Sequence, residues 1–118
     1  MALTTFSDVQ TFITGVLAAN GDSGLIGAAG CPHHDFWNSM NYTAFTTGNV
    51  PGVVDQNNSP VKILTAGNSA TSALIQLLSG TGIAGPAGFF NQMPDGGTAF
   101  TAAQIQEIAD WIDRGCPQ

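Results

Sequence analysis

Basic side chains are almost absent from this sequence, which has only Lys62 and Arg114 among its 118 residues. The acidic residues leave a formal net charge of −6, and charged residues make up 8 % of the chain, against about 25 % in a typical soluble protein. Such a chain cannot form the basic patch that binds nucleic-acid phosphates, and it is disfavoured at an anionic membrane surface. We therefore expect a protein partner or a place in a larger assembly, and no nucleic acid.

Long apolar runs are also missing. No stretch of about 18 apolar residues occurs, so membrane insertion is not expected. The opening MALTTFSDVQ lacks the basic and apolar regions of a signal peptide. The surface must be built from Asn, Gln, Thr, Ser and Gly, which favours a periplasmic or secreted protein whose mature chain carries an added start methionine. A cytoplasmic protein is the alternative.

Cysteine is scarce, with only Cys31 and Cys116. In an oxidising compartment these two residues could form a Cys31–Cys116 disulfide. Closing so long a loop would contribute about 4 kcal/mol in the chain-entropy model. The alternatives are two free thiols, or one thiolate that ligates a metal.

The length and composition predict one folded domain over residues 1–118. A chain of 118 residues has the size of a single domain and can bury roughly two thirds of its extended surface. Its apolar fraction of 43 % argues against disorder.

Helical periodicity begins in FSDVQTFITGVLAANG. Ser7 is a suitable N-cap, Gln10 completes a capping box, and Asn20-Gly21 ends the predicted helix. The apolar residues at helical spacing, which predict one buried face, are Val9, Phe12, Ile13, Val16 and Leu17.

Two more helices are predicted in the second half of the chain. One is capped by Asn68 or Ser69, runs to about Leu78 and is ended by Gly80. The other has a capping box of Thr101 and Gln104, is ended by Gly115, and carries Ile105, Ile108, Ala109 and Ile112 at helical spacing.

The remaining segments are rich in glycine, proline and asparagine. Residues 21–60 are predicted to be mostly loop, with one or two short helical turns near Asn41–Thr47, and residues 81–100 form a second irregular segment. The pattern thus predicts an all-α protein with three main helices, little or no strand, and long loops.

The order of motifs in the second half resembles a small bacterial cytochrome c domain. The motifs are AGNSATSALIQLLSG, then QMPDGG, then TAAQIQEIADWIDRG, and FSDVQTFITGVL resembles the first helix of that family. The resemblance covers about residues 6–20 and 60–116. It implies a cytochrome c-like fold in which the first and last helices cross and long loops wrap a haem. The haem would be held by Cys-x-x-Cys-His, with Met93 as the distal ligand.

The haem-attachment motif itself is degenerate. No Cys-x-x-Cys-His occurs, and the nearest stretch is GAAGCPHHDFW. In one frame Pro32 replaces the ligating histidine, and in the other His34 and Asp35 replace the second cysteine and the ligand. The spacing from the first helix is also longer than in the family. The resemblance therefore implies a domain that has lost covalent haem attachment.

A haem or copper centre is the alternative. Cys31 could supply one thioether, with His33 or His34 and Met93 as axial ligands of a haem. Copper or zinc would draw on the soft and imidazole donors Cys31, His33, His34, Met40 and Met93. The competing interpretation is structural: Met93 fills a cavity, the histidines bond to backbone groups, and Cys31 is held in a disulfide.

No convincing catalytic constellation is present, and we expect no enzyme. A Cys31 thiolate beside a histidine lacks an orienting third group, because Asp35 is more simply a turn residue. The carboxylates at positions 8, 107, 110 and 113 show no paired-acid spacing and are expected on solvated helix faces.

Six aromatic side chains in the irregular segments favour a chain without haem over one with haem. In a haem-free chain these rings would fill the space that the porphyrin otherwise occupies, because leaving that space empty would cost about 24 cal/mol per Å³ of cavity. The main hypothesis is therefore a haem-free, non-catalytic accessory or protein-interaction module, and the alternative is an electron-transfer protein with haem or copper near residues 31–34 and 93. These aromatic residues are Phe36, Trp37, Tyr42, Phe45, Phe89 and Phe90.

Overall fold

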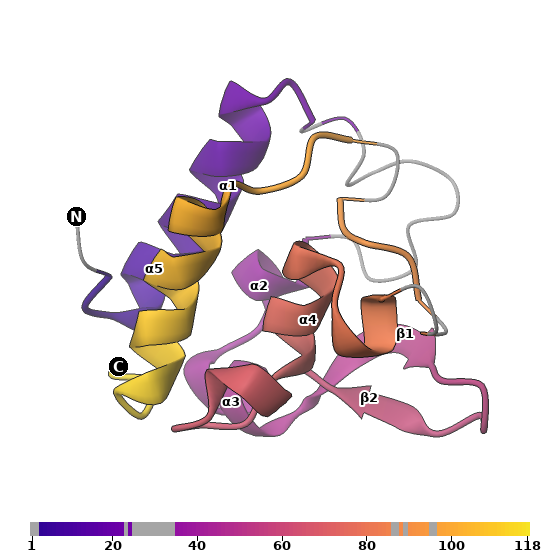
Figure 1. Cartoon of the computed structure of the whole chain (residues 1–118). Helices are drawn as coiled ribbons and strands as arrows, with labels where there is room; N and C mark the ends of the chain where they lie inside the picture. Colours follow the sequence, from indigo (N-terminus) through magenta and orange to yellow (C-terminus); the bar gives the residue numbers. More distant parts are fainter. Residues whose placement is uncertain (1–2, 23, 25–34, 86–87, 89, 95–96) are drawn as a thin grey trace.

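The computed structural model describes residues 3–22, 24, 35–85, 88, 90–94 and 97–118. Its elements are, in chain order, α1 (Phe6–Ala19), α2 (Phe36–Ser39), α3 (Tyr42–Thr47), β1 (Asn49–Val54), β2 (Pro60–Lys62), the 3-10 turn η2 (Ser69–Thr71), α4 (Ala73–Ser79), the 3-10 turn η3 (Gly82–Ala84) and α5 (Ala102–Asp113). Helices α1 and α5 lie side by side, and the β-hairpin lies on the far side of α4 from them (Figure 1). None of the helices in these ranges combines the length and the apolar character needed to cross a membrane.

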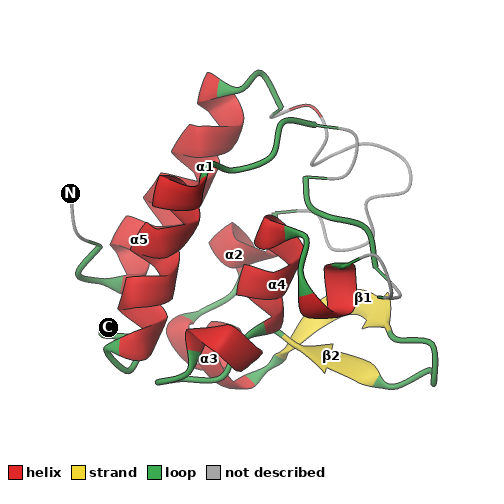
Figure 2. Cartoon of the chain, viewed as in Figure 1, coloured by secondary structure: helices red, strands yellow, loops and turns green. Residues whose placement is uncertain are grey.

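The prediction of an all-α fold with three main helices is wrong. The described residues contain five α-helices and a two-stranded antiparallel sheet, so the protein is mixed α/β (Figure 2). The strands pair Asn49 with Lys62 and Val54 with Pro60, with an irregularity in β1 between these points. Pro51 and Gly52 lie in this irregular stretch, and both residue types normally argue against a strand. They are tolerated because both strands of a two-stranded sheet are edge strands.

The first helix begins two residues earlier than predicted. Thr5, not Ser7, is the N-cap: its hydroxyl accepts a hydrogen bond from the Asp8 N–H at 3.1 Å, and the Asp8 carboxylate accepts one from the Thr5 N–H at 3.2 Å. The sequence fits a capping box at two places, Thr5-x-x-Asp8 and Ser7-x-x-Gln10. The carboxylate has the advantage of a full negative charge at the helix N-terminus, and Gln10 instead donates to the carbonyl of Trp37.

The other predicted helix ends are largely confirmed. Thr101 and Gln104 form the capping box of α5, and Gly115 follows this helix with a φ of 88°. Gly80 ends α4 in the left-handed conformation. The predicted start at Asn68 or Ser69 is wrong for α4, because a separate 3-10 turn occupies Ser69–Thr71 and α4 begins only after Ser72.

Five aromatic side chains fill the space where the helices meet. Phe45 of α3 is fully buried, and its ring centroid lies 5.1 Å from that of Phe6, 6.1 Å from that of Phe36 and 6.4 Å from that of Trp111. Trp37 stands edge-on to Phe36 at 5.5 Å. Each of α1, α2, α3 and α5 therefore contributes at least one ring to the same cluster.

The aliphatic core continues from these rings along the predicted helix faces. In α1 the predicted face is buried except for Phe12, which is half-buried, and in α5 Trp111 is fully buried. The other members of the core are Leu3, Val9, Ile13, Val16, Leu17, Val50, Ile63, Leu64, Leu74, Leu78, Phe100, Ile108, Ile112 and Cys116.

Replacing Phe45 with alanine is expected to destabilise the protein by about 3–5 kcal/mol, because the ring contacts three helices and its removal leaves a cavity at their junction. Chemical denaturation followed by circular dichroism measures this change. The exposed Val54 provides the control, and its replacement by alanine should change stability by less than about 0.5 kcal/mol. A loss below about 1 kcal/mol for Phe45→Ala would contradict the central position of this ring.

Candidate functional site

The structure addresses only part of the predicted haem or metal site. Cys31, His33 and His34 lie outside the described residues, and so does Phe89. Met40 packs against the hydrophobic core at the end of α2. Within the described ranges, no group of three or more His, Cys, Asp and Glu side chains is arranged to hold a metal ion.

Met93, predicted as a distal haem ligand or metal ligand, is half-buried in the loop after α4. Its backbone N–H donates to the carbonyl of Leu77 at 2.8 Å, and the neighbouring Gln92 donates from Nε2 to the carbonyl of Leu78 at 3.0 Å. These two bonds hold the Met-Pro loop against the end of α4. A position held in this way suits a ligand, and it equally suits a methionine that fills space between helix and loop.

The described carboxylates are used for structure. Asp22 is buried and accepts a hydrogen bond from the Thr98 N–H at 2.8 Å, which ties the end of α1 to the segment before α5. Asp113 accepts from the N–H and the hydroxyl of Ser69 at 2.8 and 2.9 Å. Asp35 precedes α2 and accepts from Nδ2 of Asn38 at 3.3 Å. Asp35 thus lies at a turn and Asp113 on an exposed helix position, as expected, whereas buried Asp22, for which no role was predicted, joins two segments that are distant in sequence.

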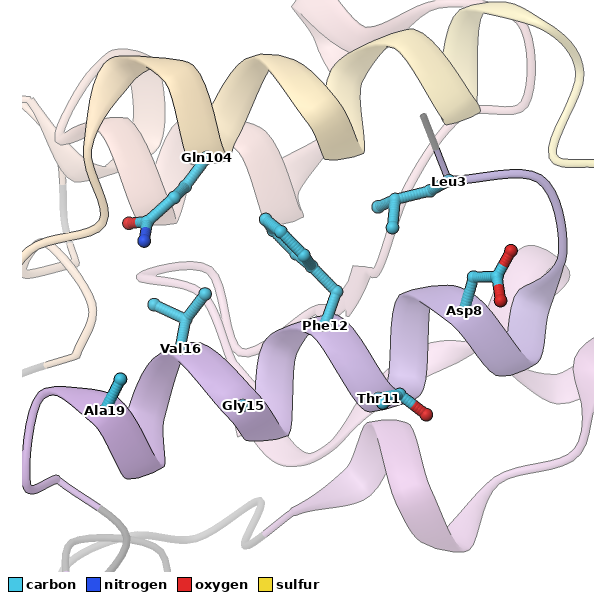
Figure 3. A pocket seen from close by; sticks show the side chains of 8 residues that line it. All are labelled: Leu3, Asp8, Thr11, Phe12, Gly15, Val16, Ala19 and Gln104. Carbon is cyan, nitrogen blue, oxygen red and sulfur yellow. The ribbon is translucent and has the colours of Figure 1, made fainter. Parts of the chain in front are cut away.

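The described surface contains a groove of about 410 Å³ between α1 and the beginning of α5. Figure 3 shows the side chains of Leu3, Phe12 and Val16 rising from α1 and its N-terminal segment toward α5, where Gln104 faces them. Thr11, Gly15 and Ala19, which also line the groove, are exposed. The groove is therefore apolar at its floor and open to solvent along α1.

Gly15 is the unusual residue of this groove. It lies inside α1 without a positive φ, and a Cβ built on it would meet no atom within 4 Å. Glycine inside a helix costs roughly 0.5–1 kcal/mol relative to alanine. Nothing in the described fold requires a glycine here. By contrast Gly80 has a φ of 70°, and a Cβ there would lie 2.9 Å from the Gln92 side chain.

One carboxylate, that of Asp8, lines the groove, and the guanidinium of Arg114 contacts Leu3 at its end. Hydrogen bonds from the Thr4 hydroxyl and backbone, and from Thr5, lower the pKa of Asp8, so this carboxylate is ionised at neutral pH. Arg114 donates to the carbonyl of Leu3 at one end of the groove. Glu107, seven residues before Arg114, lies on nearly the same face of α5. The charged groups that the structure places at the groove are thus the Asp8 carboxylate and the Arg114 guanidinium.

Cys116 is buried beyond the end of α5. Its carbonyl accepts a hydrogen bond from the Tyr42 hydroxyl, and burial raises the pKa of its thiol from 9.0 to about 11. Among the described residues Cys116 has no disulfide partner, and the predicted pairing with Cys31 stays a prediction because residue 31 lies outside the described part of the chain. A thiol so shielded is a poor nucleophile at neutral pH.

Sequence analysis did not anticipate the groove. Phe12 and Val16 were predicted together as part of a buried helix face, and only the packing of α5 shows that the face is incompletely covered at Phe12. The one signal available in the sequence was Gly15, a glycine in the middle of a strongly periodic helix.

Comparison with protein-family models, with curated proteins and with solved structures gave no match to this chain.

Gly15→Ala is expected to raise the free energy of unfolding by roughly 0.5–1 kcal/mol, because the new methyl group enters open space and the unfolded chain loses freedom. Thermal or urea denaturation measures the gain. Gly80→Ala is the matched control and should destabilise the protein, since its φ of 70° is strained for alanine. A loss of stability in Gly15→Ala would show that the fold itself needs this glycine.

The Cys116 thiol is expected to make the protein sensitive to alkali. A thiol whose pKa is raised by folding contributes stability that is present below about pH 9 and is lost as the pH rises through about 11. Urea denaturation across this range, with a reductant present, should show a steeper loss for the natural chain than for Cys116→Ala. Parallel curves for the two proteins would contradict the burial of the thiol.

Proposed function

We propose that this chain is a non-catalytic accessory module that binds another protein and holds no haem or metal among its helices. The observation on which the proposal depends is the aromatic cluster around Phe45. Three rings, one each from α1, α2 and α5, lie 5.1 to 6.4 Å from the centroid of Phe45, which belongs to α3. A junction packed in this way has its own core and needs no prosthetic group to complete it.

The satisfied polar groups of the interior support the same proposal. In the described part of the chain no buried side-chain nitrogen or oxygen lacks a hydrogen-bond partner. Ser72 is an example: its hydroxyl receives the Thr65 N–H at 2.9 Å and donates to the carbonyl of Asn68 at 2.9 Å. A preformed ligand site usually presents polar groups that are left for the ligand, and these residues present none.

The surface favours a protein as the partner. The open groove between α1 and α5 is lined by the half-buried Phe12 and by the carboxylate of Asp8, on a chain of net charge −6. Partial burial of apolar groups with a polar rim is typical of protein interfaces. The resemblance of residues 6–20 and 60–116 to cytochrome c domains adds a hypothesis of origin, in which a site for electron transfer was lost.

The competing function is electron transfer by haem or copper, and the colour of the protein distinguishes the two. The full chain is purified from a host that supplies haem and attaches it to cytochromes, and its absorption spectrum and metal content are measured. We expect no Soret band and no stoichiometric iron, copper or zinc. A Soret band, or about one equivalent of a metal per chain, would overturn the proposal and assign a centre near residues 31–34 and Met93.

A further inference from the structure

The end of α1 contains a pair of residues that is chemically labile. Asn20 is the only asparagine of the sequence that is followed by glycine. At such a pair the main-chain nitrogen of the glycine can attack the side-chain amide carbon of the asparagine, because no side chain on the glycine hinders the approach. We propose that Asn20 is a site of spontaneous deamidation, and that opening of the α1 end controls the reaction. This chemistry needs neither the protein partner nor the cofactor considered above.

The reaction is a cyclisation followed by hydrolysis. The nitrogen of Gly21 forms a bond to Cγ of Asn20 and loses its proton, the bond from Cγ to Nδ2 breaks, and ammonia leaves with that proton. Water then opens the cyclic imide that results. Opening at one carbonyl gives aspartate at position 20, and opening at the other gives isoaspartate, in which the main chain runs through the side-chain carbon. Water is the only co-reactant.

In the closed structure the attacking nitrogen is held in a hydrogen bond. The N–H of Gly21 donates to the carbonyl of Ala18 at 3.1 Å. The N–H of Asp22 donates to the carbonyl of Leu17 at 2.8 Å, and Asn20 keeps a helical conformation with a ψ of −4°. An N–H held in such a turn reaches the neighbouring side chain only after the turn opens. Deamidation of the folded chain therefore proceeds through the molecules in which the end of α1 is open.

A long-range hydrogen bond restrains this opening. The buried carboxylate of Asp22 accepts the Thr98 N–H at 2.8 Å, which fastens the turn around Gly21 to the segment before α5. Hydrogen bonds to carboxylates are among the stronger ones in proteins. The carboxylate of Asp22 thus protects the peptide unit that directly precedes it.

The same turn requires the residue that makes the pair labile. Gly21 has a φ of 75°, in the left-handed region that glycine adopts without strain. A larger residue there would hinder the attack on Asn20, but it would also strain the turn that ends α1. The conformation of the chain and its chemical lability are therefore linked at this position.

The products fit the closed end less well than asparagine does. A carboxylate at position 20 lies at the negative end of the helix dipole, and the last turn of α1 holds no basic residue to balance it. Isoaspartate also lengthens the main chain before Gly21, which moves the N–H groups of residues 21 and 22 away from their acceptors. Each modified molecule thus has an α1 end that opens more readily, and the change is irreversible.

Peptide mapping by mass spectrometry tests the proposal on the full chain, kept folded at mildly alkaline pH or unfolded in urea. Deamidation is detected as the mass gain from replacing NH2 by OH, and chromatography separates the aspartate and isoaspartate products. We expect Asn20 to be the fastest of the asparagines in urea. In the folded chain it should also react, at least about tenfold more slowly, because the turn is closed most of the time.

Two matched variants test the control by the carboxylate. Asp22→Ala removes the acceptor that fastens the turn. It should accelerate deamidation of Asn20 and hydrogen exchange of the Gly21 amide by the same factor, at least about fivefold. Asp113→Ala removes a carboxylate that accepts from Ser69 elsewhere on the molecule, and it should change neither rate more than about twofold.

The Asn20→Asp variant mimics one product. It should accelerate hydrogen exchange of the Gly21 amide about two- to fivefold, the effect of an unfavourable charge at a helix end. Circular dichroism checks that each variant is folded. If Asp22→Ala is unfolded, low urea concentrations below the unfolding transition open the turn in the natural chain instead, and the two rates should rise together.

Three results would overturn the inference. One is an Asn20 that stays unmodified in the folded chain long after the sample in urea has reacted completely. Another is an equal rate in the folded and unfolded chains, which would show that the turn offers no protection. The third is an acceleration of Gly21 exchange, by Asp22→Ala or by low urea, without any change in deamidation. None of these results bears on the presence of a haem, a metal or a protein partner.

Discussion

The fully buried ring of Phe45 is the contact on which the arrangement of the helices depends. It belongs to α3, one of the shorter helices, and touches rings from α1, α2 and α5. Short helices have little stability of their own, so α2 and α3 depend on this packing to persist. Because α1 and α5 meet the same ring, the cluster also sets how these two long helices lie beside one another. The groove between them is thus a consequence of the core beneath it.

Side-chain hydrogen bonds attach the other elements to this core. Gln10 donates to the carbonyl of Trp37 at 2.8 Å and Trp37 donates from Nε1 to the Thr14 hydroxyl at 3.1 Å, which together fix α2 on α1. Ser69 donates twice to Asp113 and fixes η2 on α5. In a chain with only 8 % charged residues, such bonds replace the ion pairs of other surfaces.

Sequence analysis predicted the helices better than the rest of the fold. Periodicity and caps located α1, α4 and α5 because the same residues that bury a face or end a helix are visible locally, as with Thr101, Gly80 and Gly115. The hairpin was missed because Pro51, Gly52 and Pro60 weaken every local strand signal, while its pairing depends on residues 49 and 62 meeting in space. The predicted ligands were chosen by residue type, and three of the five lie outside the described residues. The groove was missed because it forms only where α1 and α5 lie side by side, and the residue pattern of neither helix indicates it.

Gly15 bears most directly on whether α1 has a second role. A residue inside a helix is retained at a cost in stability when something other than the isolated fold requires it, and proteins commonly accept such costs at functional positions. Gly80 shows the ordinary case, in which the backbone of the chain itself demands glycine. At Gly15 the backbone is helical and the space above it is empty, so neither conformation nor packing accounts for it. Gly15 is exposed, so a side chain at this position would extend into solvent over the outer face of α1 and would leave the core unchanged.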